Sequence, residues 1–284
     1  MDGTAVIGRA VLRLALAAAL AGTTAVAQAA PRIASINVCT DQLLMALADP
    51  AQIAGLSPYA RDPASSWMAE RAKAFRRLSG EAEDVLALRV DAVAAAPFTR
   101  RATRAMLARQ GVRVVEFPVA QSPEGVRDNL RLMGELTGHP DRAAAEIARF
   151  NAALARVRTA AAGPRLRVLA VSRRGWITGR HSLLGALLDA AGLANAADDL
   201  GIAAGGLQPL EAIVRLKPDL IVVSDDRDLA TDQGQAFVLH PALERLYPPD
   251  RRIVIPDRLT VCDGPMLTEA LDRLGAALAR LPRR

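Results

Sequence analysis

The sequence contains little histidine, lysine or cysteine, and these shortages narrow the possible functions. Only Lys73 and Lys217 are lysines among 36 basic residues, and the arginines that give the formal net charge of +6 are spread along the whole chain. A dispersed arginine excess indicates compositional bias rather than a phosphate-binding surface. No nucleic-acid partner is therefore expected.

The three histidines argue against a site for a bare metal ion. His139, His181 and His240 fall at the start of a linker, at the start of a helix and in a loop before a proline. A receptor for free zinc or manganese needs several imidazoles or carboxylates that converge on one point. Direct binding of an uncomplexed transition metal is disfavoured, and no resident metal or cofactor is expected.

Common catalytic motifs are also missing. The glycine-rich residues 201–206 have no predicted strand before them, so they lack the context of a dinucleotide or phosphate loop and are predicted to be a flexible loop. No Gly-x-Ser-x-Gly motif stands between a strand and a helix. The sequence therefore favours a binding protein over an enzyme.

The N-terminal apolar run is too short to span a bilayer. Arg9 and Arg13 precede apolar residues 14–21, and small residues around Ala27 and Ala29 follow. This pattern predicts a secretory signal peptide over residues 1–29 and a periplasmic mature protein, with a first core helix as the alternative interpretation.

Alternating strand and helix patterns predict an α/β fold with mostly parallel sheets. A helix over residues 141–160, preceded by Pro140 and followed by Gly163 and Pro164, separates two sets of strands. The resulting domains are an N-terminal lobe at 30–138, an interlobe helix at 139–163 and a C-terminal lobe at 164–284. The predicted strands are 32–37, 52–56, 91–96, 112–117, 167–172, 219–224 and 252–255.

A faint internal repeat supports two similar lobes. Residues 83–93, EDVLALRVDAV, match residues 211–221, EAIVRLKPDLI, position for position. Each segment is typical of a short helix that leads into a buried strand. Two such lobes would leave a cleft at the carboxyl ends of their strands.

The two cysteines, Cys39 and Cys262, each follow a predicted strand, one in each half. A disulfide and two small buried side chains are equally favoured, and a disulfide over this separation would stabilise the fold by roughly 4 to 5 kcal/mol in the chain-entropy model. Thiolate binding of a metal complex and reduction-sensitive gating are further options. A Cys39 nucleophile would need a nearby histidine, which the sequence does not identify.

Three segments together carry a family resemblance. They are RIASINVCTDQLL from Arg32, IAGLSPYARDP from Ile53 and ITGRHSLLGALLDAAGLAN from Ile177, and they occur together with the repeated helix–strand unit. The chain resembles the periplasmic binding proteins for cobalamin and ferric siderophores over nearly all its mature length. The resemblance implies two α/β lobes joined by one rigid helix, with the ligand between them.

The resemblance also implies site residues. Glu83 and Glu211, one on each lobe, would dock on a membrane permease, although a glutamate in a first helical turn also simply stabilises its helix. Arg77 stands where the cobalamin-binding member has a tryptophan, which favours an anionic iron chelate. The implied ligand contacts are Asn37, Val38, Cys39, Thr40, Tyr59, Arg77, Phe98, Arg100, Trp176, Leu259, Cys262 and Asp263.

The sequence thus predicts a monomeric, non-enzymatic receptor that delivers a metal chelate, either a cobalamin-like corrinoid or a ferric siderophore, to ABC importer permease subunits. An exported α/β enzyme that uses Cys39, and a receptor-like sensor partner, are the alternatives.

Overall fold

Two β-sheets from separate stretches of the chain organise this computed structural model, which describes residues 30–224 and 233–281. The predicted signal peptide lies outside the described residues. From Pro31 onward the chain forms one compact unit. The fold class predicted from the sequence, α/β with mostly parallel sheets and a long helix between two lobes, is confirmed.

The first sheet is entirely parallel and has the order β2-β1-β3-β4. Short apolar strands such as β3, which is fully buried, explain why both faces need helical cover. The elements of this half are β1 (Ile33–Ser35), α2 (Val38–Leu47), η2 (Pro50–Gln52), β2 (Ile53–Gly55), α3 (Ala69–Ala72), α4 (Ala82–Leu86), β3 (Ala92–Ala95), α5 (Arg101–Arg109), β4 (Arg113–Glu116) and α6 (Pro123–Thr137).

The second sheet is mixed and has the order β10-β9-β5-β6-β8, with β7 also paired to β5. Strands β6 and β8 are antiparallel additions. The elements of this half are α7 (Pro140–Ala160), β5 (Arg167–Ser172), η3 (Arg173–Gly175), β6 (Trp176–Thr178), α8 (Leu183–Ala190), β7 (Ala194–Asn195), η4 (Ala196–Leu200), β8 (Gly205–Leu207), α9 (Leu210–Leu216), β9 (Leu220–Val223), α10 (Gln233–Ala236), α11 (Pro241–Leu246), β10 (Arg252–Val254), η5 (Asp257–Leu259) and α12 (Met266–Ala279).

The internal repeat corresponds to the same strand order in both halves. In each half a central strand lies between a short parallel neighbour on one side and two successive parallel strands on the other, β2-β1-β3-β4 and β7-β5-β9-β10. Asp91 accepts a hydrogen bond from the Arg32 backbone N–H at 2.7 Å, and Asp219 accepts one from the Arg167 backbone N–H at 2.9 Å. The repeated aspartates therefore fix the start of each central strand.

A left-handed residue follows the repeated helix in both halves, three residues after the end of α4 and directly after the end of α9. Arg89 and Lys217 occupy equivalent positions and have φ values of 49° and 47°. This conformation is unfavourable for a residue with a Cβ atom, and it turns the chain from helix to strand.

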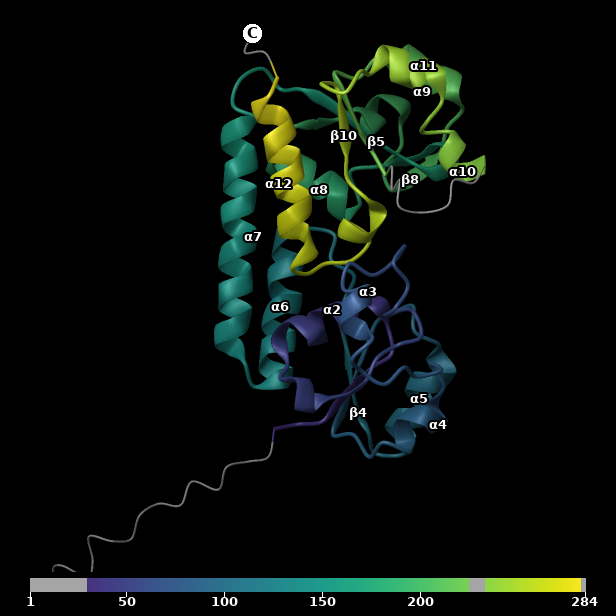
Figure 1. Ribbon diagram of the computed structural model, residues 1–284, viewed down its shortest axis with the longest axis vertical. Coiled ribbons are helices and arrows are strands. Elements are labelled where there is room, and N and C mark those ends of the chain that lie inside the picture. Colours follow the sequence, from purple (N-terminus) through teal and green to yellow (C-terminus); the bar gives the residue numbers. More distant parts are fainter. Residues whose placement is uncertain (1–29, 225–232, 282–284) are drawn as a thin grey trace, which may run out of the picture. The chain divides into compact units, whose positions relative to one another are not determined.

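The long helix α7 lies along one edge of the structure and packs against both α6 and α12 (Figure 1). Ser122 caps α6 by accepting a hydrogen bond from the Gly125 N–H, and Gly138 ends it with a φ of 76°. Helix α7 then begins at Pro140, and its buried residues include Phe150 and Leu154. The predicted helix over 141–160 is thus confirmed, while the domain boundaries around it stay a prediction.

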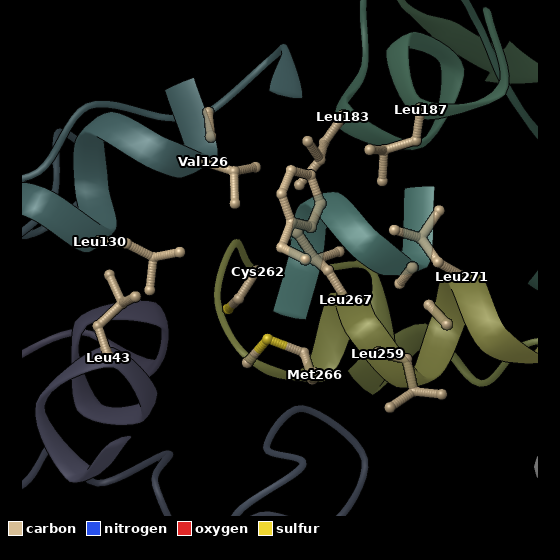
Figure 2. Close-up of a cluster of buried hydrophobic side chains, with 14 of the residues drawn as sticks. Leu43, Val126, Leu130, Leu183, Leu187, Leu259, Cys262, Met266, Leu267 and Leu271 are labelled. Carbon is tan, nitrogen blue, oxygen red and sulfur yellow. The ribbon is translucent and has the colours of Figure 1, made fainter. Parts of the chain in front are cut away.

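One apolar core joins the two sheets. Ile33 of β1 and Val168 of β5 belong to the same buried cluster, whereas the next residue of each strand, Ala34 or Leu169, faces a separate cluster on the opposite face of its own sheet. Figure 2 shows the shared cluster, in which Leu43 of α2, Val126 and Leu130 of α6, Leu183 and Leu187 of α8, and Leu267 and Leu271 of α12 meet. The two halves are packed on common side chains.

The seven predicted strands are confirmed as β1, β2, β3, β4, β5, β9 and β10. The prediction of a flexible loop over residues 201–206 is wrong at its end, because Gly205 and Gly206 begin β8 and pair with β6. Among the described residues, no helix combines the length and hydropathy of a membrane span.

Replacing Arg89 with glycine should stabilise the protein. Glycine adopts the left-handed conformation without the Cβ clash that costs other residues about 1–2 kcal/mol. Glycine also loses more conformational entropy on folding, which offsets part of this gain. We expect a rise of about 0.5–1 kcal/mol in the free energy of unfolding, measured with urea. Arg89→Ala keeps the Cβ atom and serves as the control; an equal gain in both variants would contradict this explanation.

Candidate functional site

A cavity of about 700 Å³ lies where the two sheets direct the carboxyl ends of their strands toward each other. Its walls contain residues that follow β1, β3 and β4 in the first half, and residues at or after the ends of β5, β9 and β10 in the second. Ligands of parallel α/β folds bind at this end of the strands. The volume falls in the range of small-molecule sites.

The first half contributes the start of α2 and two loops. Asn37 caps α2 by accepting a hydrogen bond from the Cys39 N–H at 2.9 Å. Thr40, which is buried, shares a 2.7 Å hydrogen bond with Ser35. The wall residues of this half are Asn37, Val38, Cys39, Thr40, Leu43, Ala96, Phe98 and residues 117–121.

Exposed apolar side chains occur in the wall on both sides. Phe98 is 84% exposed and Val119 is 49% exposed on the first half, and Trp176 is 45% exposed and Val261 58% exposed on the second. Large apolar surfaces left open to solvent are typical of binding sites. These four side chains can cover a flat, apolar ligand.

Two glycines allow close contact between the segment around Trp176 and the β8 segment. Gly175 has a φ of 77°, and a Cβ atom there would lie 2.4 Å from the Gln208 carbonyl oxygen. A Cβ atom on Gly205 would lie 2.7 Å from Cζ2 of the Trp176 ring. The indole therefore packs directly on the β8 backbone, with its remaining surface available to the cavity.

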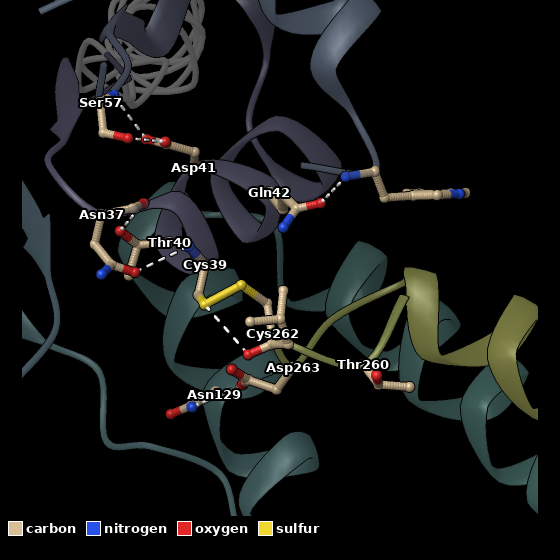
Figure 3. Close-up of a disulfide and its surroundings, with 12 residues drawn as sticks. Asn37, Cys39, Thr40, Asp41, Gln42, Ser57, Asn129, Thr260, Cys262 and Asp263 are labelled. Atoms are coloured by element: carbon tan, nitrogen blue, oxygen red, sulfur yellow. Dashed lines mark hydrogen bonds between the residues drawn. A yellow bond between two sulfur atoms is a disulfide. The ribbon is translucent and has the colours of Figure 1, made fainter. Parts of the chain in front are cut away.

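Cys39 and Cys262 form a disulfide, with their Cα atoms 5.1 Å apart (Figure 3). The pairing that the sequence left open is thus present. Cys39 is in the first turn of α2, and Cys262 lies in the loop before α12, so the bond links the two halves beside the cavity. The contact from Cys39 to the Val261 carbonyl oxygen, at 4.0 Å, is not a hydrogen bond because a disulfide sulfur carries no proton.

Asp263 is a buried carboxylate in the cavity wall. Asn129 of α6 donates from Nδ2 to Asp263 at 2.7 Å and to the Pro118 carbonyl oxygen at 2.7 Å. Burial raises the pKa of Asp263 to about 6, against the lowering effect of the Asn129 hydrogen bond. The loop after the disulfide is in this way tied to the first half by a polar contact as well.

Asp257 is the second carboxylate of the wall. It accepts a hydrogen bond from the Ser172 hydroxyl at 3.2 Å. Burial raises its pKa, and the Ser172 hydrogen bond and the nearby charge of Arg173 oppose that shift.

Deeper in the first half, burial raises the pKa of Asp41 to about 7, although Ser57 donates to it from both its backbone and its hydroxyl.

Seven of the residues expected to contact ligand lie in the wall: Asn37, Val38, Cys39, Thr40, Phe98, Trp176 and Asp263. Five do not. Tyr59 is 62% exposed outside the cavity, and Leu259 and Cys262 point into the core, at 1% and 2% exposure. Arg77 donates to the Pro58 carbonyl oxygen, and Arg100 forms an ion pair with Glu81, so neither arginine reaches the wall.

The expected docking residues occupy equivalent places. Glu83 is in the first turn of α4 and Glu211 in the first turn of α9, and both are exposed. Neither forms an ion pair with a described residue. The structure therefore leaves both carboxylates accessible, and their role stays a prediction.

Sequence reasoning missed several wall residues. Ser172, Ser224 and Asp257 end or follow predicted strands, so the rule that ligands bind at carboxyl strand ends could have found them. His181 lies in the wall because its segment folds back from β6, which the sequence pattern did not reveal. Across residues 30–224 and 233–281, no three His, Cys, Asp or Glu side chains are grouped to hold a metal ion.

The family model for periplasmic binding proteins matches residues 33–247. A curated relative, a cobalamin-binding protein of Halobacterium salinarum, is 29% identical over 218 residues. The match covers 75% of this chain but only 59% of that relative's length.

Solved structures have the same fold. A periplasmic heme binding protein from Pseudomonas aeruginosa is 25% identical, with a TM-score of 0.69 over 88% of this chain and 93% of its own. The periplasmic vitamin B12 binding protein BtuF of Vibrio cholerae is 16% identical, with a TM-score of 0.65 over 88% of this chain and 96% of its own, and shows the fold alone.

Removing the disulfide should destabilise the protein. The bond connects residues separated by 223 positions, so its loss frees a long loop in the unfolded chain. We expect Cys39→Ser with Cys262→Ser to lower the free energy of unfolding by about 2–5 kcal/mol, measured by urea denaturation. A reductant should lower the stability of the wild type similarly and leave the double variant unchanged; a wild type indifferent to reductant would contradict the assignment.

Proposed function

Because the chain belongs to the periplasmic binding protein family, we propose that it is the solute-binding component of an ABC importer. In this proposal the cavity holds a metal chelate, a cobalamin-like corrinoid or a ferric siderophore, and the protein delivers it to permease subunits. The metal enters with the cargo and is not a resident cofactor.

The cavity itself is the observation that supports this function most strongly. It has a volume of about 700 Å³, it is walled by both halves, and it presents the Trp176 and Phe98 rings. Flat aromatic faces stack favourably on planar macrocycles and on siderophore backbones. The relative named as a cobalamin-binding protein, and the solved structure named for heme, support a ligand of this kind.

The disulfide argues against an enzyme that uses Cys39. A cysteine nucleophile must be a thiolate, and Cys39 is bonded to Cys262. The family and the structural neighbours are likewise binding proteins. We therefore assign no catalytic residue.

Delivery requires a surface that a permease can recognise from both lobes. Glu83 and Glu211 project from helices that the internal repeat makes equivalent. Two equivalent carboxylates can meet arginines of two related permease subunits, and such charge-assisted contacts orient a complex. We place this delivery in the periplasm, after removal of the predicted signal peptide.

Ligand binding should quench the fluorescence of one tryptophan. The chain contains two, and only Trp176 lies in the cavity wall, whereas Trp67 is hydrogen-bonded to Glu269 elsewhere. Titration with cobinamide, cobalamin, haem and ferric siderophores should give saturable quenching by at least one of them in Trp67→Phe. In Trp176→Phe the quenching should disappear and the affinity, measured by calorimetry, should fall about tenfold or more, since a stacked ring contributes on the order of 1–3 kcal/mol. Folded protein that binds no member of the panel would refute the proposal.

If Glu83 and Glu211 dock on the permease, their removal should impair ligand uptake but not ligand binding. Glu83→Ala with Glu211→Ala should abolish ligand uptake into cells or permease vesicles, because the carboxylates would contact only the permease. Ligand affinity should stay within about twofold of wild type, which is less than about 0.5 kcal/mol. Glu135→Ala, at another exposed glutamate on α6, is the matched control. A loss of affinity in the double variant, or normal uptake by it, would contradict the docking role.

A further inference from the structure

The charge of the cavity wall contrasts with the charge of the whole chain. The sequence carries 36 basic and 30 acidic residues. Yet within the described part of the chain, the wall contains no arginine or lysine, and its only carboxylates are Asp257 and Asp263. A ligand in this cavity therefore meets two carboxylates and, within the described wall, no guanidinium or ammonium group; His181 is the one imidazole there.

The position of Asp263 is fixed from both sides. It is 7% exposed, it follows the cysteine that is bonded to α2, and its Oδ2 accepts the 2.7 Å hydrogen bond from Asn129. Asn129 is held in turn by the Pro118 carbonyl oxygen. Asp263 cannot swing away from an incoming ligand without breaking these contacts. Its pKa of about 6 leaves it mainly ionised at slightly alkaline pH.

Asp257 extends the acidic surface toward β5. Its hydrogen bond comes from the neutral hydroxyl of Ser172, and Ser224, also in the wall, is buried close by. Arg173 acts on Asp257 electrostatically but is exposed and outside the wall. Hydroxyl groups can serve as donors or acceptors, so Asp257, Ser172 and Ser224 can together accept hydrogen bonds from a ligand.

The guanidinium groups that could have received an anionic ligand lie elsewhere. Arg77 binds the Pro58 carbonyl oxygen, and Arg100 pairs with Glu81 on the exposed surface. A carboxylate or catecholate group placed against Asp257 and Asp263 would lose its hydration and find no guanidinium or ammonium partner in the described wall. Such like-charge contacts are strongly unfavourable in a desolvated site.

We propose that the cavity selects chelates whose periphery is uncharged and donates hydrogen bonds, such as amide-bearing macrocycles, and rejects chelates with peripheral carboxylates or catecholates. Asp257 and Asp263 are the residues that determine this specificity: they accept hydrogen bonds from the favoured ligand and repel the other class. This inference rests on the proposed binding function, and it narrows the cargo to one class of chelate.

The test compares ligands that share one macrocycle and differ only in peripheral charge. The probes are a corrinoid with amide side chains and its hydrolysed carboxylate form, together with haem and its diamide. Affinities are measured by calorimetry at slightly alkaline pH. We expect the wild type to bind the amide form of at least one macrocycle at least tenfold more tightly than the carboxylate form.

Charge-removing variants test the two residues. Asp263→Asn and Asp257→Asn retain the shape of the side chain. Each should reduce the ratio of the affinity for the amide form to the affinity for the carboxylate form at least threefold, mainly because the carboxylate form binds more tightly. Asp250→Asn, at an exposed residue outside the cavity, makes the same charge change and should leave this affinity ratio unaltered. The comparison in wild-type protein stands even if one variant fails to fold.

The outcomes distinguish this inference from the function on which it rests. Equal or tighter binding of the carboxylate form by the wild type would overturn the charge selection and leave the receptor function intact. An affinity ratio that is unchanged in both folded variants would overturn the role of Asp257 and Asp263. Folded protein that binds neither form of either macrocycle, nor any ferric siderophore, would overturn both proposals.

Discussion

The rest of the structure depends on the apolar core that the two sheets share. One face of each sheet belongs to the same buried cluster as side chains of α2, α6, α7, α8 and α12, so residues from both halves share one core. Close-packed interiors resist deformation. The cavity walls are consequently held near their binding geometry before a ligand arrives, which lowers the ordering cost of binding. The Cys39–Cys262 disulfide adds a covalent restraint at the same junction.

The repeated strand order gives the two halves equivalent frameworks but different chemistry at the cavity. Asp91 and Asp219 anchor the starts of equivalent central strands, and the carboxyl ends of both sheets lie at the cavity. The first half then supplies the start of α2 and the exposed Phe98, while the second supplies Trp176 on β6 and the acidic loops after β10. Apolar surface thus comes from both halves, whereas the two carboxylates of the described wall come from the second half.

The loop after β10 combines several of these constraints in a short segment. Cys262 holds it to α2, Asp263 binds Asn129 of α6, and Val261 is exposed in the wall. A carboxylate in such a fixed loop keeps its position and its unfavourable interaction with anions. The core restraint and the charge of the site are therefore physically linked. Because the loop is rigid, the carboxylate cannot move away from an anionic ligand, and the site distinguishes anionic from uncharged ligands.

The sequence by itself determined the seven parallel strands, α7 and the repeat, because periodic apolar patterns and proline or glycine boundaries are local signals. The family resemblance also implied Asn37, Thr40, Phe98, Trp176 and Asp263 as ligand contacts; these residues lie in the cavity wall, and their contact with a ligand stays a prediction. Only the tertiary structure decided the cysteine pairing, the added strands β6 and β8, and the place of His181. It alone showed that Arg77 and Arg100 are engaged outside the cavity, because the direction of a long side chain depends on partners distant in sequence.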